Sequence, residues 1–162
     1  MPKVAIVMGS KNDFSVVKQA VHTLKDFGVE AEVRVLSAHR TPDEAHKLAT
    51  TAEERGIEVI IGCAGKAAHL AGVLAANSIL PVIGLPIKSS TMDGLDSLLS
   101  TVQMPAGIPV ATVAINGSEN AALLAVQIMA NKHPELKKKI KDYKEKMKQK
   151  ILADDKLLQE EL

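Results

Sequence analysis

Aromatic residues are scarce in this sequence, whose 162 residues include two phenylalanines, one tyrosine and no tryptophan. A flavin or nucleic-acid site built on aromatic stacking is therefore disfavoured. The formal net charge is only +1, and the basic residues are not interleaved with aromatics, which argues against nucleic acid as a partner. These absences favour a small molecule as the ligand.

Cysteine is nearly absent as well, since Cys63 is the only one. One cysteine cannot form an internal disulfide, and the first residues have neither the apolar core nor the cleavage site of a signal peptide. No stretch approaches ~18 uninterrupted apolar residues, so no membrane partner is expected. We therefore expect a cytoplasmic protein.

Small and aliphatic hydrophobic residues are abundant, and hydrophobic residues make up 46% of the chain. The length suits one hydrophobic core, and we expect a single catalytic domain over residues 1–162. Because a short chain has difficulty covering so much apolar surface by itself, we also expect a homo-oligomer.

Short apolar runs alternate along the chain with segments of helical periodicity. Continuous runs that stop at glycine or polar residues are typical of strands buried on both faces, and hence of a parallel sheet. The predicted strands are 4–8, 31–36, 59–63, 82–85 and 110–115. The predicted helices are one between the cap Asp13 and the stop Gly28, then 42–55, 95–103 and 119–131. This order predicts an α/β fold, a three-layer α/β/α arrangement with a flavodoxin-like, doubly wound parallel sheet of about five strands.

The end of the chain is predicted to be a C-terminal helical extension, residues 133–162. Its apolar residues step by three or four positions, so the intervening lysines occupy the wet side of an amphipathic helix rather than an arm for nucleic acid or membrane. These apolar residues are Leu136, Ile140, Tyr143, Met147 and Ile151. We expect this stripe to pack on a neighbouring subunit, and we expect the nearly all-apolar helix 120–130 to be covered by another subunit too.

In a doubly wound sheet, ligands bind beyond the carboxyl ends of the strands, beside the point where the winding reverses. The loop after the first strand contains Gly9, Ser10 and Asp13. Glycine lets the backbone approach a ligand, and the serine hydroxyl can add a hydrogen bond. Asp13 has two interpretations, a helix cap or an acceptor for a ribose diol.

The second loop, residues 37–42, contains Ser37, His39 and Arg40 before Pro42. Arg40 offers a bidentate fork for phosphate, and proline suits the first position of a helix. His39 can give and take a proton near neutral pH. The alternative is that both side chains only stabilise neighbouring structure.

The third loop follows the strand that contains Cys63, and its small residues, Gly65 among them, allow a ligand to lie against the backbone. His69 is either a substrate contact or a hydrogen-bonded residue at a tight helix start. Cys63 is interpreted as small packing rather than as a nucleophile. Two histidines without a nearby carboxylate pair or a second cysteine make a poor metal site. His22, His46 and His133 are interpreted as surface or packing positions.

Together these loops resemble the family of 5-(carboxyamino)imidazole ribonucleotide mutases of purine biosynthesis. The matching segments are Met8-Gly9-Ser10 with Asp13, Ser37-Ala38-His39-Arg40-Thr41-Pro42, Ala67-Ala68-His69-Leu70 with Gly72, and later blocks at 81–84, 95–100, 102–105, 107–112 and 120–125. The resemblance covers roughly residues 4–130.

The resemblance implies an α/β/α enzyme, usually octameric, that moves a carboxyl group within a ribonucleotide without ATP, metal or bound cofactor. By position, Ser10, Ser37 and Arg40 would hold the phosphate and Asp13 the ribose. His39 would be the general acid and base that accompanies loss and recapture of carbon dioxide. Gly65 and His69 would line the substrate site.

The sequence departs from the usual pattern at several positions: Asn12 replaces serine, Lys66 replaces glycine, Ala71 replaces proline, and Gly62-Cys63 replaces alanine-glycine. We hypothesise that Lys66 points away from the migrating carboxylate, because a close cation would oppose its loss as carbon dioxide.

Two other functions remain open. One is an aminoimidazole ribonucleotide carboxylase that uses free carbon dioxide, although that class typically has lysine where this chain has Arg40. The other is a non-catalytic nucleotide- or flavin-binding module on the same architecture.

Overall fold

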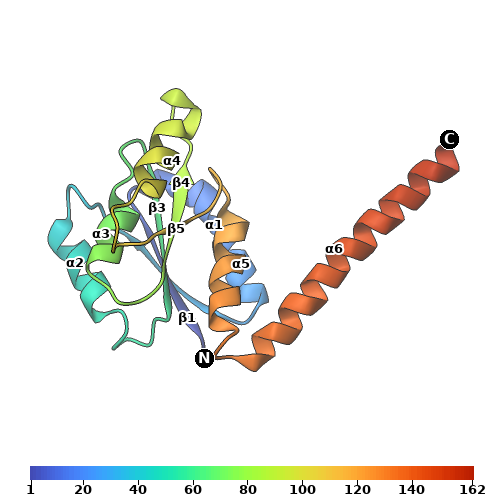
Figure 1. Cartoon of the computed structure of the whole chain (residues 1–162), viewed down its shortest axis with the longest axis horizontal. Coiled ribbons are helices and arrows are strands. Elements are labelled where there is room, and N and C mark those ends of the chain that lie inside the picture. Colours follow the sequence, from blue (N-terminus) through green and yellow to red (C-terminus); the bar gives the residue numbers. More distant parts are fainter.

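The computed structural model describes all 162 residues and shows a parallel sheet between two layers of helices (Figure 1). The strands are β1 (Lys3–Met8), β2 (Glu30–Val35), β3 (Val59–Gly65), β4 (Val82–Ile87) and β5 (Ala111–Thr112). The order in the sheet is β2-β1-β3-β4-β5, with every neighbouring pair parallel. This order confirms the predicted flavodoxin-like α/β fold, with the winding reversing between β1 and β3.

Eight helical segments connect and flank the strands. They are η1 (Lys11–Asp13), α1 (Phe14–Asp26), α2 (Pro42–Thr51), α3 (Leu70–Ala76), η2 (Met92–Gly94), α4 (Leu95–Val102), α5 (Ser118–Met129) and α6 (Pro134–Glu161). The short helix α3 begins directly after His69, where a tight helix start was one of two interpretations, but its range was not predicted because its seven small and aliphatic residues resemble a loop beside a ligand as much as a helix. None of these helices combines the length and hydropathy needed to span a bilayer.

Successive side chains of β1 point to opposite faces of the sheet and so belong to two separate parts of the core. Val4, Ile6 and Met8 point toward α1 and α5, where they belong to a cluster of 21 buried residues. Ala5 and Val7 point toward α2 and α3, in a cluster of 13. Since all five side chains are fully or almost fully buried, β1 is covered on both faces, as its unbroken apolar run predicts.

Strand β5 is shorter than the predicted strand 110–115. Its ladder with β4 includes only Ala111 and Thr112, opposite Ile83 and Gly84. A further backbone bond joins the Val113 N–H to the Gly84 carbonyl before the chain turns away. The strand lies at the edge of the sheet, where one neighbour alone supports it.

One apolar face of helix α5 is buried within its own chain. Its buried residues pack on α1 and the sheet, and they are Ser118, Ala121, Ala122, Ala125, Val126 and Met129. The expectation that another subunit must cover this helix is therefore unnecessary for that face. Leu123 and Leu124, on its other side, are only partly buried.

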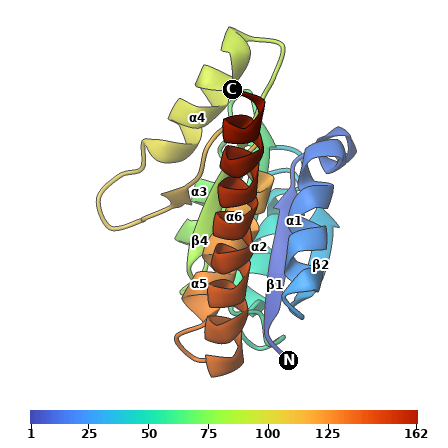
Figure 2. The same ribbon diagram turned by 90° about the vertical axis from the view of Figure 1, so that its right-hand side faces the viewer.

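Helix α6 is anchored at its base and then leaves the body (Figures 1 and 2). Leu136 is 1% exposed, and burying a leucine contributes roughly 1.5–3 kcal/mol. The Nε2 atom of His133 lies 2.8 Å from Oε1 of Glu58, and the Lys139 ammonium donates to the Phe27 carbonyl over 2.7 Å. Farther along, the helix runs away from α5 at an angle.

Candidate active site

A cavity of about 350 Å³ lies at the carboxyl ends of the central strands, beside the reversal of winding. Its walls come from the loops that follow β1, β2, β3 and β4. All seven residues predicted to form the site line it: Ser10, Asp13, Ser37, His39, Arg40, Gly65 and His69. The convergence follows from the topology, because parallel strands end at the same edge of a sheet.

The first loop is held by a reciprocal pair of hydrogen bonds between Ser10 and Asp13. The Ser10 N–H donates to Oδ2 of Asp13 over 3.2 Å, and the Ser10 hydroxyl oxygen accepts from the Asn12 N–H over 3.2 Å. Ser10 is thus the cap of η1, and the Asp13 side chain makes no cap hydrogen bond to α1. The interpretation of Asp13 as the side-chain cap of α1 is therefore wrong, because its carboxylate accepts from the Ser10 N–H in the pair of bonds that caps η1 instead.

Burial raises the pKa of Asp13, and the hydrogen bond from the Ser10 N–H offsets this only in part. Beneath the loop, Cys63 is completely buried, and burial, reinforced by the charge of Asp13, raises the pKa of its thiol far above its ordinary value. A thiol in this environment is not a nucleophile at neutral pH. The interpretation of Cys63 as a packing residue agrees with this burial.

The second loop closes on itself before α2 begins. The Ser37 hydroxyl oxygen accepts from the N–H groups of His39 and Arg40, over 3.3 and 3.1 Å. The Thr41 hydroxyl oxygen accepts from the Ser37 N–H over 2.8 Å, and Pro42 occupies the first turn of α2. Nη2 of Arg40 reaches the Gly9 carbonyl over 3.4 Å, which ties the second loop to the first.

Two histidine rings meet across the cavity from different loops. Nε2 of His39 lies 2.9 Å from Nδ1 of His69, and the rings are nearly perpendicular, with centroids 5.0 Å apart. At this distance one nitrogen donates to the other. The contact joins the second loop to the third at the cavity wall.

The third loop depends on close backbone packing. A Cβ atom on Gly62 would lie 2.8 Å from the Cα of Ala71, and one on Gly65 would lie 3.2 Å from the Ile87 carbonyl oxygen. Lys66 then adopts a left-handed conformation with φ of 55°, which costs a residue with a Cβ atom roughly 1–2 kcal/mol. The glycine that Lys66 replaces would adopt this conformation without that cost.

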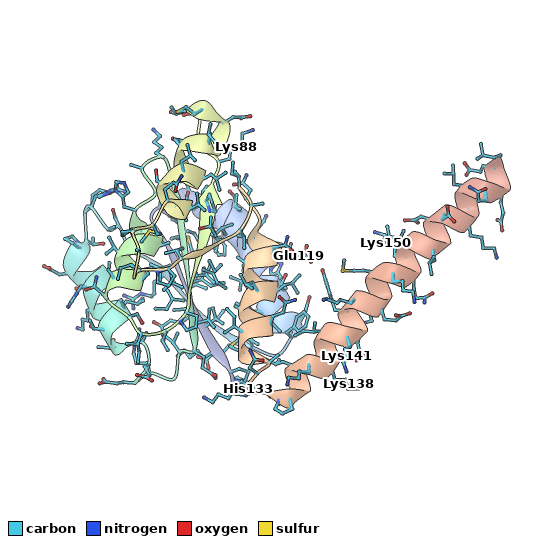
Figure 3. All side chains as sticks on the ribbon, in the orientation of Figure 1. Lys88, Glu119, His133, Lys138, Lys141 and Lys150 are labelled. Atoms are coloured by element: carbon cyan, nitrogen blue, oxygen red, sulfur yellow. The ribbon has the colours of Figure 1, made fainter.

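The fourth loop adds wall residues that the sequence analysis missed, namely Lys88, Ser89 and Ser90. Lys88 lies at the end of the molecule opposite His133 (Figure 3), and its ammonium lies 2.7 Å from Oδ1 of Asp93. The polar residues directly after β4 could have predicted this fourth wall. Parallel strands end at the same edge of the sheet, so the loop after β4 lies beside the loops after β1, β2 and β3.

The other histidines lie outside the cavity. Nδ1 of His46 lies 2.8 Å from Oδ1 of Asn77, and His133 pairs with Glu58. No group of three or more His, Cys, Asp or Glu side chains is arranged to hold a metal ion. The wall of the cavity itself carries hydroxyl groups, two histidine rings, cationic side chains and the Asp13 carboxylate.

Comparison with known proteins identifies the family. The family model described as AIR carboxylase matches residues 3–150. The chain belongs to this family. Membership confirms the resemblance seen in the loop residues, and the matched range includes every wall of the cavity as well as the first half of α6.

Curated relatives carry a more specific name. The N5-carboxyaminoimidazole ribonucleotide mutase of Pyrococcus abyssi is 63% identical over 148 residues, which are 91% of this chain and 85% of that protein. The protein of the same name from Thermotoga maritima is 57% identical, over 94% of this chain and 89% of its own. These names agree with the activity predicted from the sequence.

Among solved structures, the crystal structure of Treponema denticola PurE superposes with a TM-score of 0.86 at 32% identity. The match covers 96% of this chain and 97% of that chain. Because the uncovered 4% is much shorter than α6, the shared fold includes most of this helix, although the sequence blocks that match the family's pattern end near residue 130.

Proposed function

We propose that this enzyme converts N5-carboxyaminoimidazole ribonucleotide into the isomer carboxylated at the ring carbon, a step of purine biosynthesis. One observation carries the proposal: His39 stands in a single cavity with the anion-binding and ribose-binding residues expected of a mutase of this family. The names of relatives 57–63% identical to the chain support the same conclusion.

The phosphate binds at the junction of the first two loops. The hydroxyl oxygens of Ser10 and Ser37 each accept backbone N–H groups, so both hydroxyl hydrogens remain available to donate to an anion. The Arg40 guanidinium, joined to this junction through the Gly9 carbonyl, adds charge-assisted hydrogen bonds. Asp13 accepts from the ribose diol, with Oδ1 available because the Ser10 N–H uses Oδ2.

His39 moves the proton in two steps. As the carbamate C–N bond breaks, the electron pair stays on nitrogen, the imidazolium of His39 protonates that nitrogen, and carbon dioxide is released into the cavity. The ring carbon then uses its electron pair to form a bond to carbon dioxide. His39 removes the proton displaced from that carbon, which restores the imidazolium for the next turnover.

The cavity must keep carbon dioxide beside its acceptor during this exchange. General acid–base catalysis contributes about 10²- to 10⁴-fold, and positioning of the two reactants supplies the remainder by making the recapture effectively intramolecular. His69 lines the wall and holds the His39 ring in place through the 2.9 Å contact.

A second candidate is an aminoimidazole ribonucleotide carboxylase, favoured by the description of the matching family model. The test offers the purified enzyme the carboxyamino substrate and, separately, aminoimidazole ribonucleotide with bicarbonate. We expect rapid conversion of the first only. Efficient conversion of only the second would replace the mutase by the carboxylase. A colourless protein would further exclude a flavin-carrying module.

We also propose that the chain self-associates and forms the octamer that the family resemblance implies. Helix α4 supports it, because Leu95, Leu99 and Val102 form an exposed apolar stripe, each 44–45% accessible. Light scattering on the purified protein measures the mass, and a monomer at micromolar concentration would contradict the proposal. The cytoplasmic location expected from the sequence is part of this proposal too.

A further inference from the structure

The wall of the active-site cavity carries three cationic side chains, Arg40, Lys66 and Lys88. Only Lys88 has an acidic partner, since its ammonium lies 2.7 Å from Oδ1 of Asp93. Arg40 and Lys66 take part in no ion pair. Asp93 does not line the cavity, so the pair holds the Lys88 ammonium at the rim of the cavity rather than inside it.

The turn that carries Asp93 folds back against Lys88. Its three residues, Met92, Asp93 and Gly94, all have left-handed backbone conformations, with φ of 51°, 57° and 95°. A Cβ atom on Gly94 would lie 3.3 Å from the Cα of Lys88, so the two segments are in close contact. On another side, the Lys88 N–H donates to Oδ1 of Asn116 over 2.9 Å. The backbone of Lys88 is therefore held in place, and aspartate suits the turn because it tolerates a left-handed conformation better than most residues.

The side chain of Lys88 is free to move on this fixed backbone. It is 53% exposed, and the ammonium stands on a flexible four-carbon stem. With the Asp93 carboxylate present, the ammonium lies at the rim; without that carboxylate, the same side chain can extend into the cavity that it already lines. An ion pair as exposed as this one shifts such an equilibrium by about two- to fivefold, which sets the size of the expected effect.

The strand order places Lys88 far from the proposed phosphate site. That site lies at the loops after β2 and β1, whereas Lys88 follows β4, and β3 lies between β1 and β4. Two strand spacings amount to about 10 Å. With the phosphate bound at the first two loops, the imidazole ring and its carboxylate extend toward the third and fourth. His39 reaches the same side of the cavity, because its ring meets His69 of the third loop.

A cation beside this carboxylate would slow the proposed reaction. The carboxylate loses its charge when it leaves as carbon dioxide, so a neighbouring cation stabilises the bound substrate and product more than the intermediate between them. An interaction that is made in the ground state and lost in the transition state lowers KM and kcat together. The site therefore works faster when the Lys88 ammonium stays outside.

We propose that Asp93 is a positioning residue of this enzyme, which holds the Lys88 ammonium at the rim of the cavity and away from the carboxylate that migrates. The inference rests on the proposed mutase function, and it adds the means by which the fourth loop keeps a cation off the reacting group. Asp93 acts only through Lys88 and touches no reacting atom.

Asp93→Asn tests the proposal, because asparagine keeps the size of the side chain and also tolerates the left-handed conformation. Its amide is neutral and releases the Lys88 ammonium. Calorimetry measures the binding of two ribonucleotides, the ring-carboxylated product and aminoimidazole ribonucleotide, which lacks the carboxylate. We expect the variant to bind the carboxylated ligand about two- to fivefold more tightly and the uncarboxylated ligand as the native chain does. In turnover of the carboxyamino substrate, KM and kcat should fall together by a similar factor.

A second substitution separates this role from a purely structural one. Adding Lys88→Met to Asp93→Asn removes the ammonium and keeps a flexible apolar stem, so ligand binding and kcat should return to their native values. Damage to the turn would instead lower kcat in the single and the double variant alike.

The matched control is Asp142→Asn, which breaks another exposed ion pair. There the Lys138 ammonium lies 2.7 Å from Oδ2 of Asp142, and Lys138 lies at the opposite end of the body from Lys88 (Figure 3). This variant loses the same charge as Asp93→Asn, and it should bind both ribonucleotides as the native chain does.

Four results would overturn the role of Asp93: unchanged binding in Asp93→Asn, equal tightening of both ligands, a double variant that behaves as the single one, or weaker binding of the carboxylated ligand in Lys88→Met alone. The last result would show that Lys88 already holds the carboxylate in the native enzyme. A native chain that binds neither ribonucleotide contradicts the proposed function and this inference with it. Native turnover combined with an unchanged Asp93→Asn variant overturns this inference alone.

Discussion

His39 and His69, thirty residues apart in the chain, are joined by a 2.9 Å contact between Nε2 and Nδ1. Two loops that follow different strands thus share one hydrogen bond at the wall of the cavity. The contact determines which nitrogen of His39 faces His69, and so how the ring can present a proton to a ligand.

Replacing His39 with asparagine should lower kcat by about 10²- to 10⁴-fold, because the proton donor and acceptor is removed. Substrate binding, measured by calorimetry, should change much less. Near-normal turnover would eliminate the proton-carrying role of His39.

His69→Asn should retain more activity than His69→Leu, because the amide can still hydrogen-bond His39 whereas leucine cannot. Both variants should leave a turnover above that of His39→Asn. The pH profile of kcat is compared across the three variants. A shifted profile indicates that His69 positions His39, whereas loss of fold lowers kcat equally at every pH. Equal activity of the asparagine and leucine variants would show that the contact does not matter.

Asp13 should make the native state less stable as the pH rises. Burial raises its pKa above the ordinary value of 3.8, so the native state holds the proton more tightly than the unfolded state. The resulting stabilisation is present at low pH and is lost as the pH rises through the range above 3.8. Asp13→Asn should therefore be at least as stable as the native chain at pH 7, with a difference that shrinks below pH ~4.

Thermal unfolding of both proteins across this range checks the prediction. The same variant should bind substrate more weakly, because the ribose acceptor is lost. A variant that is less stable at pH 7 would show that Asp13 stabilises the loop more than its burial costs.

Lys66→Gly should leave stability unchanged or raise it by up to about 1 kcal/mol, because relief of the left-handed conformation competes with the greater freedom of glycine in the unfolded chain. Turnover should stay within about tenfold of the native enzyme if the ammonium points away from the carboxylate. Lys66→Ala is the matched control, since it removes the ammonium and keeps the strain. Slowing of both variants by more than tenfold would place the ammonium in the reaction.

Gly62→Ala should destabilise the fold by about 1–3 kcal/mol, the usual cost of overpacking. The new Cβ would lie 2.8 Å from the Cα of Ala71, and a backbone atom cannot rotate aside. Urea unfolding measures the loss. Gly9→Ala is the control, because the nearest atoms lie 4.0 Å away, and equal losses in both would refute the steric explanation.

The sequence was sufficient to place the main site residues because their placement depends on topology alone. Periodicity predicts the strands, and the parallel order brings Ser10, His39 and Gly65 to one edge. The contact between His39 and His69 could not be predicted, because it depends on the orientation of two side chains from separate loops. Lys88 was missed because only the first three strand ends were considered.

Element ends were predicted less well where tertiary contacts decide them. Helix α2 ends at Thr51 rather than at 55, and the chain reaches Gly56 through turns. The predicted strand 110–115 shortens to two residues, because only β4 supports it. In both cases the local pattern is compatible with a longer element, and neighbouring structure sets the limit.

The complete burial of Cys63 gives the molecule a built-in reporter. Cys63 is the chain's only thiol, it lies where β1 and β3 pair side by side, and none of its surface is accessible. Its side chain belongs to the cluster that α1 and α5 cover, so an alkylating reagent can reach it only when the packing of these helices on the sheet, or the sheet itself, opens. The rate of alkylation therefore measures how often this part of the core opens, without any label having to be introduced.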